Sequence, residues 1–403
     1  MKKKIIDYKR KAIRLLIAAG VLAAILALLL ILRSIQSVSE WMASVVSRRW
    51  IEAASRIFGL LPFSVYELFL YVAIISLIVL VVMAIVCFCH KNKARGVSFL
   101  LTMVVIVLSF GNVYTLSAGF SYYRTDVDIP KCEKTFFTQE DKDFVVRLAE
   151  EFFADFNEVG RAVERDEDGR TVLPYTISEL SDVFAEEYKR LDSDYFSDYT
   201  PKAKAILSKN IMSHMHITGV FFAPFGEANV NPLTPDCSMP VTMAHELAHA
   251  KGVMREDEAN LVAYWVTVTS DDPYLRYSGY RACYSYMFNI VAYFDSDKAN
   301  ELYANIDECI KKEWTLTGEF WSQFTLLHDI AEWFNNVYLK LQSQKEGTGS
   351  YNESVIPPGE VEIPGGGEST EGGVTGGGTQ TVQAFFLNNV QRMLVQAISR
   401  RLG

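Results

Sequence analysis

Three long apolar stretches without a charged residue constrain this 403-residue chain more than any other feature of its sequence. They cover residues 15–32, 68–89 and 97–123. Each has about the length that a helix needs to cross a hydrocarbon core of roughly 30 Å. A segment in lipid must satisfy its own backbone N–H and C=O groups, and a helix does so. The sequence therefore predicts a multi-pass membrane region over residues 15–123, with transmembrane helices at 15–32, 68–89 and 97–120.

A cleaved signal peptide is the alternative interpretation of the first stretch. Its apolar part is longer than the core of a typical signal peptide. The sequence Leu32-Arg33-Ser34 at its end also lacks the small residues of a cleavage site. We therefore favour three transmembrane helices and contact with a lipid bilayer.

Basic residues predict the orientation of these helices. Lysines and arginines dominate residues 1–14, and Lys91, Lys93 and Arg95 lie between the second and third helices. Because cytoplasmic loops are enriched in such residues, we expect residues 1–14 to form a basic cytoplasmic N-terminus. Three crossings then place the rest of the chain outside the cytoplasm, at the cell membrane.

The loop between the first two helices carries an apolar pattern of its own. Apolar residues recur there at helical spacing, and Trp41 and Trp50 are of a type enriched at the membrane–water boundary. We favour a helix that lies in this boundary. A helix packed on the membrane spans fits nearly as well.

The remainder of the chain reads as one mostly helical domain with a small sheet, over residues 130–350. Its acidic character, within a net charge of -9, and the absence of a basic stripe argue against a nucleic-acid partner. Strand formers and turn residues predict a hairpin over 219–231, with Pro224 at an edge or bend. Apolar periodicity predicts helices, two of them capped by Thr176 and Thr200, at residues 138–163, 177–196, 201–209, 256–269, 274–294, 298–312 and 317–341.

The segment His245-Glu246-Leu247-Ala248-His249 provides the strongest chemical signal in this domain. Two histidines four residues apart lie on one face of a helix, where both imidazoles can reach a single zinc ion. Glu246 between them would lie beside the metal, where it can deprotonate a zinc-bound water. Ser238 and Pro240 mark the expected start of the helix.

A third protein ligand must come from elsewhere. Arg255 stands where the metzincin pattern has a third histidine, and a guanidinium has no lone pair to offer zinc. On an unbroken helix, Glu256 would lie roughly 10 Å further along the axis than His249. We therefore predict that the helix ends near Gly252 and that the chain reverses, returning Glu256 to the metal from a second helix. Asn260, four residues later, would hydrogen-bond a ligand histidine.

This arrangement resembles the gluzincins, in which a Glu-x-x-x-Asp motif on a later helix supplies the third ligand. Here the motif reads Glu256-Asp257-Glu258-Ala259-Asn260, with asparagine replacing aspartate and a much shorter gap after His249. The register favours Glu256 as the ligand and leaves Glu258 as the alternative. Over roughly residues 10 to 355 the chain resembles a bacterial family of membrane-anchored, zincin-like proteins. The resemblance implies a gluzincin-type α+β domain in the cell envelope with Zn2+ as its cofactor.

The resemblance also implies how a substrate would bind. In zincins a sheet edge beside the metal holds a peptide by backbone hydrogen bonds. We expect this edge at residues 227–231, with Glu227, Ala228 and Asn229 as substrate-binding residues; a purely structural hairpin is the equal alternative. Aromatic residues at helical spacing more often belong to a core, but four side chains are candidates to stabilise a transition state: Tyr264, Tyr277, Tyr280 and His328.

The remaining features leave alternatives open. The predicted domain contains Cys132, Cys237, Cys283 and Cys309, which would form one or two disulfides or stay as free thiols. Cys237 is also a weak candidate for a thiolate ligand. Glycine and proline predict a flexible linker over residues 351–380. An amphipathic C-terminal helix over residues 381–403 would dock on the domain, contact the membrane surface or bind a partner.

Together these features predict a membrane-anchored zinc metalloendopeptidase whose catalytic domain lies outside the cytoplasm. A peptide or protein would be its substrate, with Glu246 as general base and His245, His249 and Glu256 as metal ligands. The alternative is a non-enzymatic, zinc-stabilised envelope domain that senses or binds peptides for a partner. Intramembrane proteolysis is disfavoured, because the residues around the motif are too polar for lipid. The sequence does not indicate an oligomeric state.

Overall fold

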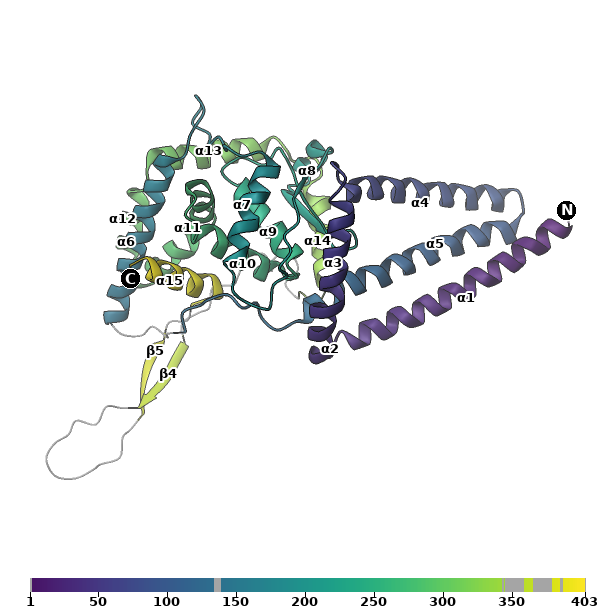
Figure 1. Cartoon of the computed structure of the whole chain (residues 1–403), viewed down its shortest axis with the longest axis horizontal. Helices are drawn as coiled ribbons and strands as arrows, with labels where there is room; N and C mark the ends of the chain where they lie inside the picture. The colour runs from purple at the N-terminus through teal and green to yellow at the C-terminus, as the bar shows by residue number, and fades with distance from the viewer. Residues whose placement is uncertain are drawn as a thin grey trace, which may run out of the picture.

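A computed structural model describes residues 2–133, 139–342, 344, 359–364, 379–384 and 387–402. Three long helices extend from one end of a compact helical domain (Figure 1). These are α1 (Lys2–Leu32), α4 (Val65–Cys89) and α5 (Lys93–Tyr114). All three are long and apolar enough to cross a membrane, as the sequence predicts.

Helix α5 holds the membrane region together by packing on both α1 and α4. A polar contact adds to the apolar packing, because the Asn112 side chain donates to the carbonyl of Leu22 on α1 at 3.1 Å. Helix α4 begins three residues earlier than predicted. Its start is capped by Ser64, whose hydroxyl accepts from the Glu67 backbone N–H at 3.1 Å.

The loop after α1 forms a helical segment across the ends of the membrane helices. It consists of α2 (Gln36–Trp41), the π-helix η1 (Met42–Ser47) and α3 (Arg48–Phe58). The Trp50 indole donates to the carbonyl of Pro224 at 3.1 Å, and the Ser55 hydroxyl donates to that of Gly226 at 2.6 Å. The predicted helix is therefore present, and it packs on the domain as well as on the membrane region.

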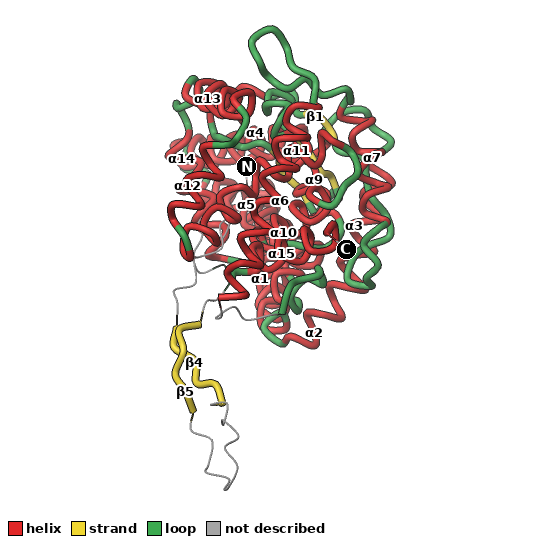
Figure 2. Tube along the Cα trace, turned by 90° about the vertical axis from the view of Figure 1, so that its left-hand side faces the viewer, coloured by secondary structure: helices red, strands yellow, loops and turns green. Residues whose placement is uncertain are grey.

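The domain core is formed mainly by α6 (Gln139–Ala162), α10 (Glu256–Val268) and α11 (Pro273–Phe294), with α7 (Ile177–Lys189) and α9 (Met239–Ala250) packed beside them. Figure 2 shows how strongly helices dominate the fold. The apolar stripe predicted on α6 is buried at Leu148, Phe152 and Phe156. A capping box between Thr176 and Glu179 starts α7 as expected.

Several helix boundaries differ from the prediction. Helix α7 ends at Lys189, well before residue 196. The helix predicted over 201–209, with Thr200 as its cap, is wrong: this stretch holds the short strand β1 (Lys204–Ala205), and α8 (Lys209–His214) follows. The two helices predicted over 298–341 are three in the structure, namely α12 (Ser296–Ala304), α13 (Glu308–Ser322) and α14 (His328–Leu341).

The predicted hairpin is present as β2 (Gly219–Phe222) and β3 (Glu227–Val230), with Pro224 in the turn. The strand order is β1-β3-β2, so β3 lies in the centre, parallel to β1 and antiparallel to β2. The prediction of a substrate-binding edge at residues 227–231 is therefore wrong. Glu227, Ala228 and Asn229 are buried. Strand β1, which is not predicted, pairs with the side of β3 that was expected to be open.

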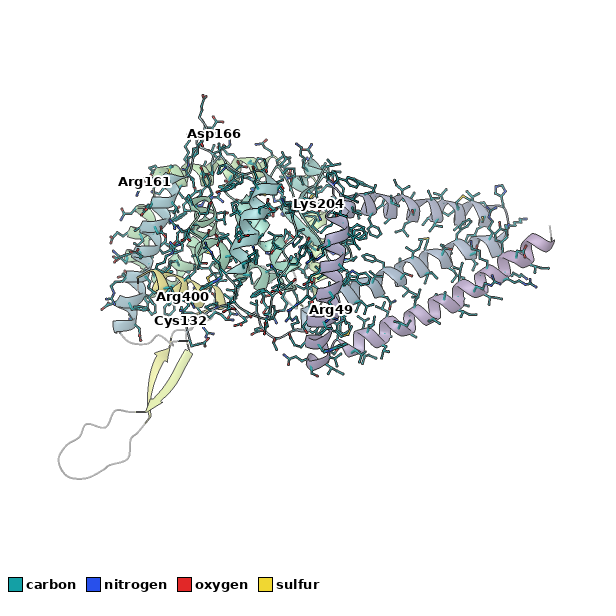
Figure 3. All side chains as sticks on the ribbon, in the orientation of Figure 1. Arg49, Cys132, Arg161, Asp166, Lys204 and Arg400 are labelled. Carbon is teal, nitrogen blue, oxygen red and sulfur yellow. The ribbon has the colours of Figure 1, made fainter. Side chains whose placement is uncertain are left out.

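Glu227 instead joins the sheet to the membrane region. Its carboxylate accepts from the backbone N–H groups of Val65 and Tyr66 at 3.2 and 2.7 Å, at the start of α4. Lys204 on β1 pairs with the same carboxylate and donates to the carbonyl of Phe58 at 2.8 Å. Figure 3 shows Lys204 at this junction between the domain and α3. The sheet is thus fixed directly above the membrane helices.

The C-terminal helix docks on the domain. Helix α15 (Asn389–Leu402) buries Val390, Met393, Leu394 and Ile398 in the main core, against α10, α11 and α6. It begins later than the predicted 381, because β5 (Thr379–Ala384) pairs with β4 (Gly359–Pro364) in an antiparallel ribbon. The rest of the predicted linker over 351–380 lies outside the described residues. All six cysteines are free, so the disulfide alternative is not realised in this structure.

Candidate metal centre

Helix α9 carries both histidines and ends where the sequence predicts. Its last turn closes with a Schellman motif, in which Val253 N–H donates to Ala248 O at 3.2 Å and Gly252 N–H donates to His249 O at 3.0 Å. Gly252 has a φ of 100°, a left-handed conformation that favours glycine. At the other end, Pro240 lies in the first turn, but Ser238 makes no capping bond through its side chain. The Ser238 hydroxyl instead accepts from Arg281.

The reversal at Gly252 makes Glu256 the first residue of α10 and returns it to the histidines. The Nε2 atoms of His245 and His249 lie 3.1 Å apart. The Glu256 Oε2 atom lies 3.1 Å from the first and 3.5 Å from the second. The predicted geometry, in which Glu256 joins the histidines from a second helix, is therefore confirmed.

These separations fit the chemistry of a tetrahedral zinc site. With bonds of about 2.0–2.1 Å to nitrogen, tetrahedral geometry places ligand atoms roughly 3.3 Å apart. The three ligand atoms identified above are spaced at 3.1 to 3.5 Å. Among the described residues, His245, His249 and Glu256 form the group of side chains that could hold a metal ion. Cys237 does not belong to this group; its thiol contacts Ser238 and Thr317.

Both histidines are oriented through their other ring nitrogen. Nδ1 of His245 lies 2.9 Å from Oδ1 of Asn260, as predicted, and Nδ1 of His249 lies 2.6 Å from the carbonyl of Val253. An oxygen acceptor at Nδ1 keeps the proton there and leaves the Nε2 lone pair for a metal. The Val253 carbonyl is available because the turn at Gly252 brings it back beside its own helix.

His249 and Glu256 are buried, His245 is partly buried, and the charges of His249 and Glu256 act on each other. Burial alone would raise the pKa of Glu256, but the neighbouring histidines outweigh it and lower the pKa to about 2. Burial would likewise lower the pKa of His249, but the charge and hydrogen bond of Glu256 raise it to about 9. Without a metal, the cluster is thus an ion pair between a carboxylate and an imidazolium. A divalent cation could replace the proton of that pair.

Glu246 lies on the same helix, packed against strand β2. Burial raises its pKa to about 7, although the two histidines oppose this shift. Its Oε2 atom is buried without a hydrogen-bond partner in the described structure. Gly219 makes room for the side chain: a Cβ atom at residue 219 would approach Oε1 of Glu246 to 2.4 Å. Gly219 is not among the site residues predicted from the sequence, where its only signal is a glycine at the start of a run of strand formers.

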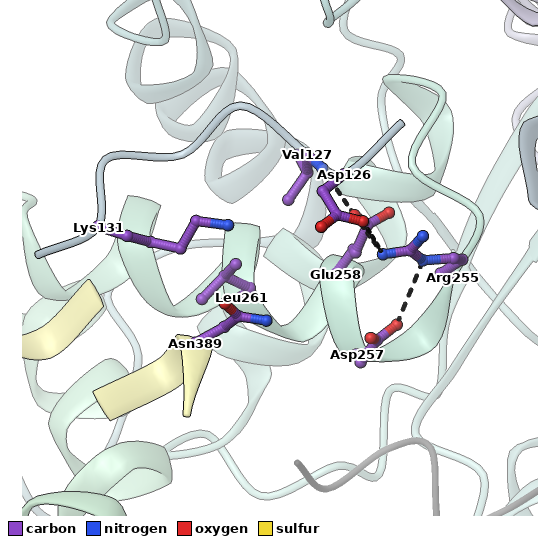
Figure 4. Close-up of a pocket in the computed structure, with 8 residues that line it drawn as sticks. All are labelled: Asp126, Val127, Lys131, Arg255, Asp257, Glu258, Leu261 and Asn389. Carbon is purple, nitrogen blue, oxygen red and sulfur yellow. Dashed lines mark hydrogen bonds and ion pairs between the residues drawn. The ribbon is translucent and has the colours of Figure 1, made fainter. Parts of the chain in front are cut away.

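Glu258, the alternative ligand, faces away from the cluster. Its Oε1 atom accepts from the Val127 N–H at 2.6 Å and pairs with Arg255 at 2.7 Å. Figure 4 shows these contacts at a small pocket between Asp126 and Lys131. With a volume of about 10 Å³, the pocket has room for one water molecule at most. The alternative in which Glu258 is the third ligand is therefore wrong for this structure. Glu258 instead anchors the segment that enters the domain after α5.

The three tyrosines predicted to stabilise a transition state belong to the domain core. Tyr277 and Tyr280 are completely buried and donate to the carboxylates of Glu313 and Asp155. Tyr264 packs against Tyr286 in the same core. His328 contacts the ring of His216 and pairs with Asp329 at 3.3 Å. These contacts give the three tyrosines roles in the core and leave His328 at the start of α14.

Three other tyrosines form a hydrogen-bonded group. The Tyr122 hydroxyl is 2.7 Å from that of Tyr338 and 3.3 Å from that of Tyr114, and Tyr114 and Tyr338 are also bonded to each other. We call these three residues the tyrosine cluster. Burial, the other two tyrosines and the charge of Glu256 together raise the pKa of Tyr122 well above its usual value. The cluster therefore lies within electrostatic range of a predicted metal ligand.

Aromatic side chains connect the metal helix to the membrane helices. The Phe221 ring stacks on His249 with centroids 6.2 Å apart. Its neighbour Phe222 contacts Tyr66 at 4.8 Å and Phe110 at 6.1 Å, on α4 and α5. Strand β2 thus lies between the ligands and the ends of two membrane helices. The candidate metal centre is at the membrane-facing end of the domain.

Comparison with known proteins identifies the family. A family model described as a protein of unknown function (DUF3810) matches residues 44–356. The chain belongs to this family, because the match covers most of its length. The matched region includes α4, α5 and the whole ligand cluster, and it ends before α15. No curated protein and no solved structure matches the chain.

Proposed function

We propose that this DUF3810 protein is a membrane-anchored zinc metallopeptidase that hydrolyses peptide bonds outside the cytoplasm. The observation that carries the proposal is the convergence of His245, His249 and Glu256 with ligand atoms 3.1 to 3.5 Å apart, beside the buried Glu246. Basic residues at the start of α1 and around the connection between α4 and α5 support the proposed side of the membrane.

Each residue of the site has a role in this reaction. His245, His249 and Glu256 would hold zinc, with Asn260 and the Val253 carbonyl fixing the two imidazoles. Zinc supplies a Lewis acid that acidifies water and polarises a carbonyl. Glu246 would take a proton from the attacking water and deliver it to the leaving amine. Glu246 lies between the two histidines on α9, next to the position that a bound metal would take.

Strand β2 is the sheet edge that we assign to the substrate. Asn231 N–H donates to Thr218 O at 2.7 Å, so the hydrogen-bonded pairs between β2 and β3 fall at Thr218, Val220 and Phe222. The peptide groups of Gly219 and Phe221 then point away from β3. An extended peptide could add to this edge beside Glu246, which Gly219 contacts.

Zinc content tests the ligand set directly. We expect one zinc per chain in the purified full-length protein and its loss in Glu256→Ala, measured by elemental analysis. Glu258→Ala is the matched control and should keep its zinc, because Glu258 binds Val127 and Arg255 instead. Wild-type protein without zinc would overturn the proposal. Retention of zinc by Glu256→Ala would remove Glu256 from the site.

A further inference from the structure

Helix α14 presents an apolar face that no other described part of the chain covers. Trp333, Phe334 and Leu341 are 60%, 62% and 67% exposed, and Ile330 and Val337 on the same face are also exposed. Their spacing places them in one stripe along the helix. Ala331 and Leu339, on another side of the helix, are buried against the protein. The helix is thus amphipathic with its larger apolar face outward.

The far end of α14 is bonded to two membrane helices. Arg33, one residue beyond α1, donates to the Gln342 side chain at 3.0 Å and to the Leu341 carbonyl at 3.3 Å. Tyr338 bonds to Tyr114 at the end of α5 through the tyrosine cluster. The spans of α1 and α5 end at Leu32 and Gly119. These contacts place α14 at the level where the membrane helices leave the bilayer, which agrees with its position in Figure 1.

Other exposed apolar side chains lie at the same level. Leu207 is 82% exposed, and its backbone N–H donates to Glu67 near the start of α4 at 2.8 Å. Ile211 follows on α8, and Leu60 and Phe63 precede α4. Leu326, just before α14, is 77% exposed. The other large exposed apolar residues of the described domain, Val172, Tyr293 and Tyr303, are scattered. Apolar exposure therefore concentrates around the ends of the membrane helices.

We propose that α14 lies in the membrane–water boundary, with Ile330, Trp333, Phe334, Val337 and Leu341 in contact with lipid. Amphipathic helices bind this boundary by burying their apolar face roughly 5–10 Å deep. Tryptophan is among the residues most enriched there. Bonds to α1 and α5 hold the helix at the required depth. Lipid contact by α14 would then hold Tyr338 against Tyr114 and Tyr122.

Fluorescence quenching in a bilayer tests this contact on the full chain. The protein is placed in phospholipid nanodiscs, with and without lipids brominated on the acyl chain near the headgroup. We expect part of the tryptophan emission to be quenched by the brominated lipids, with Trp41 and Trp50 also contributing, and Trp333→Phe to reduce that part measurably. Trp265→Phe is the matched control, since Trp265 is only 7% exposed in the domain and its removal should leave the quenching intact.

A second variant reports the orientation of the helix. Glu332→Trp in the Trp333→Phe background places an indole on the side of α14 opposite the apolar stripe, and we expect it to escape quenching. Equal quenching of wild type and Trp333→Phe would overturn the proposal. Equal quenching combined with cross-linking between copies through α14 would assign the face to a second copy of the chain. Zinc content does not enter these measurements, so the result is independent of the proposed function.

Discussion

The proposed metal ligands and the residues packed around them come from very different distances along the chain. The ligands and their orienting amide all lie between His245 and Asn260, on two helices joined by the turn at Gly252. Their surroundings come from strand β2, where Gly219 lies against Glu246 and Phe221 stacks on His249, and from the membrane helices that pack against Phe222. A local motif can specify a metal site, whereas its surroundings depend on the packing of the whole molecule.

The largest effect is expected from the local part of the site. Glu246→Gln removes the carboxylate that accepts a proton and should lower kcat by about 10²–10⁴-fold. Zinc content should stay at one per chain, because Glu246 is not a ligand in the geometry of the cluster. Peptide hydrolysis and elemental analysis on the same preparation check both results. Full activity would refute the mechanism, and loss of zinc would favour a zinc-stabilised, non-enzymatic domain.

A smaller effect is expected where a distant strand meets the local motif. Gly219→Ala places a Cβ atom 2.4 Å from Oε1 of Glu246, so the carboxylate must move. A displacement on this scale should reduce kcat on the order of 10²-fold and leave zinc content unchanged. The measurement is turnover with the same peptide substrate.

Gly318→Ala provides the matched control for that substitution. A Cβ at residue 318 would meet nothing within 4 Å, so activity should not change. If Gly219→Ala were as active as Gly318→Ala, the contact between β2 and Glu246 would have no bearing on catalysis. Strand β2 would then make no contribution to catalysis at residue 219.

The smallest effect is expected from the residue that orients a ligand. Asn260→Ala removes the acceptor 2.9 Å from Nδ1 of His245 and should weaken zinc binding by about 10–100-fold. Asn260→Asp keeps an acceptor and should bind zinc at least as tightly as wild type. Competition with a chromogenic chelator measures both affinities. Equal affinity of the alanine variant would mean that packing alone orients His245.

Features that depend on neighbouring residues could be predicted from the sequence. Spacing over residues 245–260 predicts the helix end, the reversal and the role of Asn260, because each depends on neighbours within about one or two helical turns. Uncharged length predicts the three membrane helices for a similar reason. In both cases the physical constraint is contained in the segment itself.

Failures occurred where a partner far along the chain decides the structure. Residues 204–205 form a strand because they pair with Asn229 and Val230, which no local pattern around 201–209 reveals. Because β1 is not predicted, the open edge of the sheet is predicted at β3, which lies in the centre. The tyrosine cluster joins residues 114 and 338, and aromatic side chains at either position carry no signal of the other. Tyr277 and Tyr280 are predicted as transition-state stabilisers from their residue type alone, whereas in the structure both are buried in the core.

Helix α15 completes a core whose other helices are synthesised well before it. Until the ribosome has made Met393, Leu394 and Ile398, the apolar faces of α6, α10 and α11 that receive them remain uncovered. Helix α10 also carries Glu256, so the packing around the helix that holds this proposed ligand is complete only when α15 has docked. A chain interrupted in the glycine-rich tract would expose apolar surface and be open to aggregation and degradation. Burial of these apolar faces therefore requires α15, which lies far along the chain from the helices that it covers.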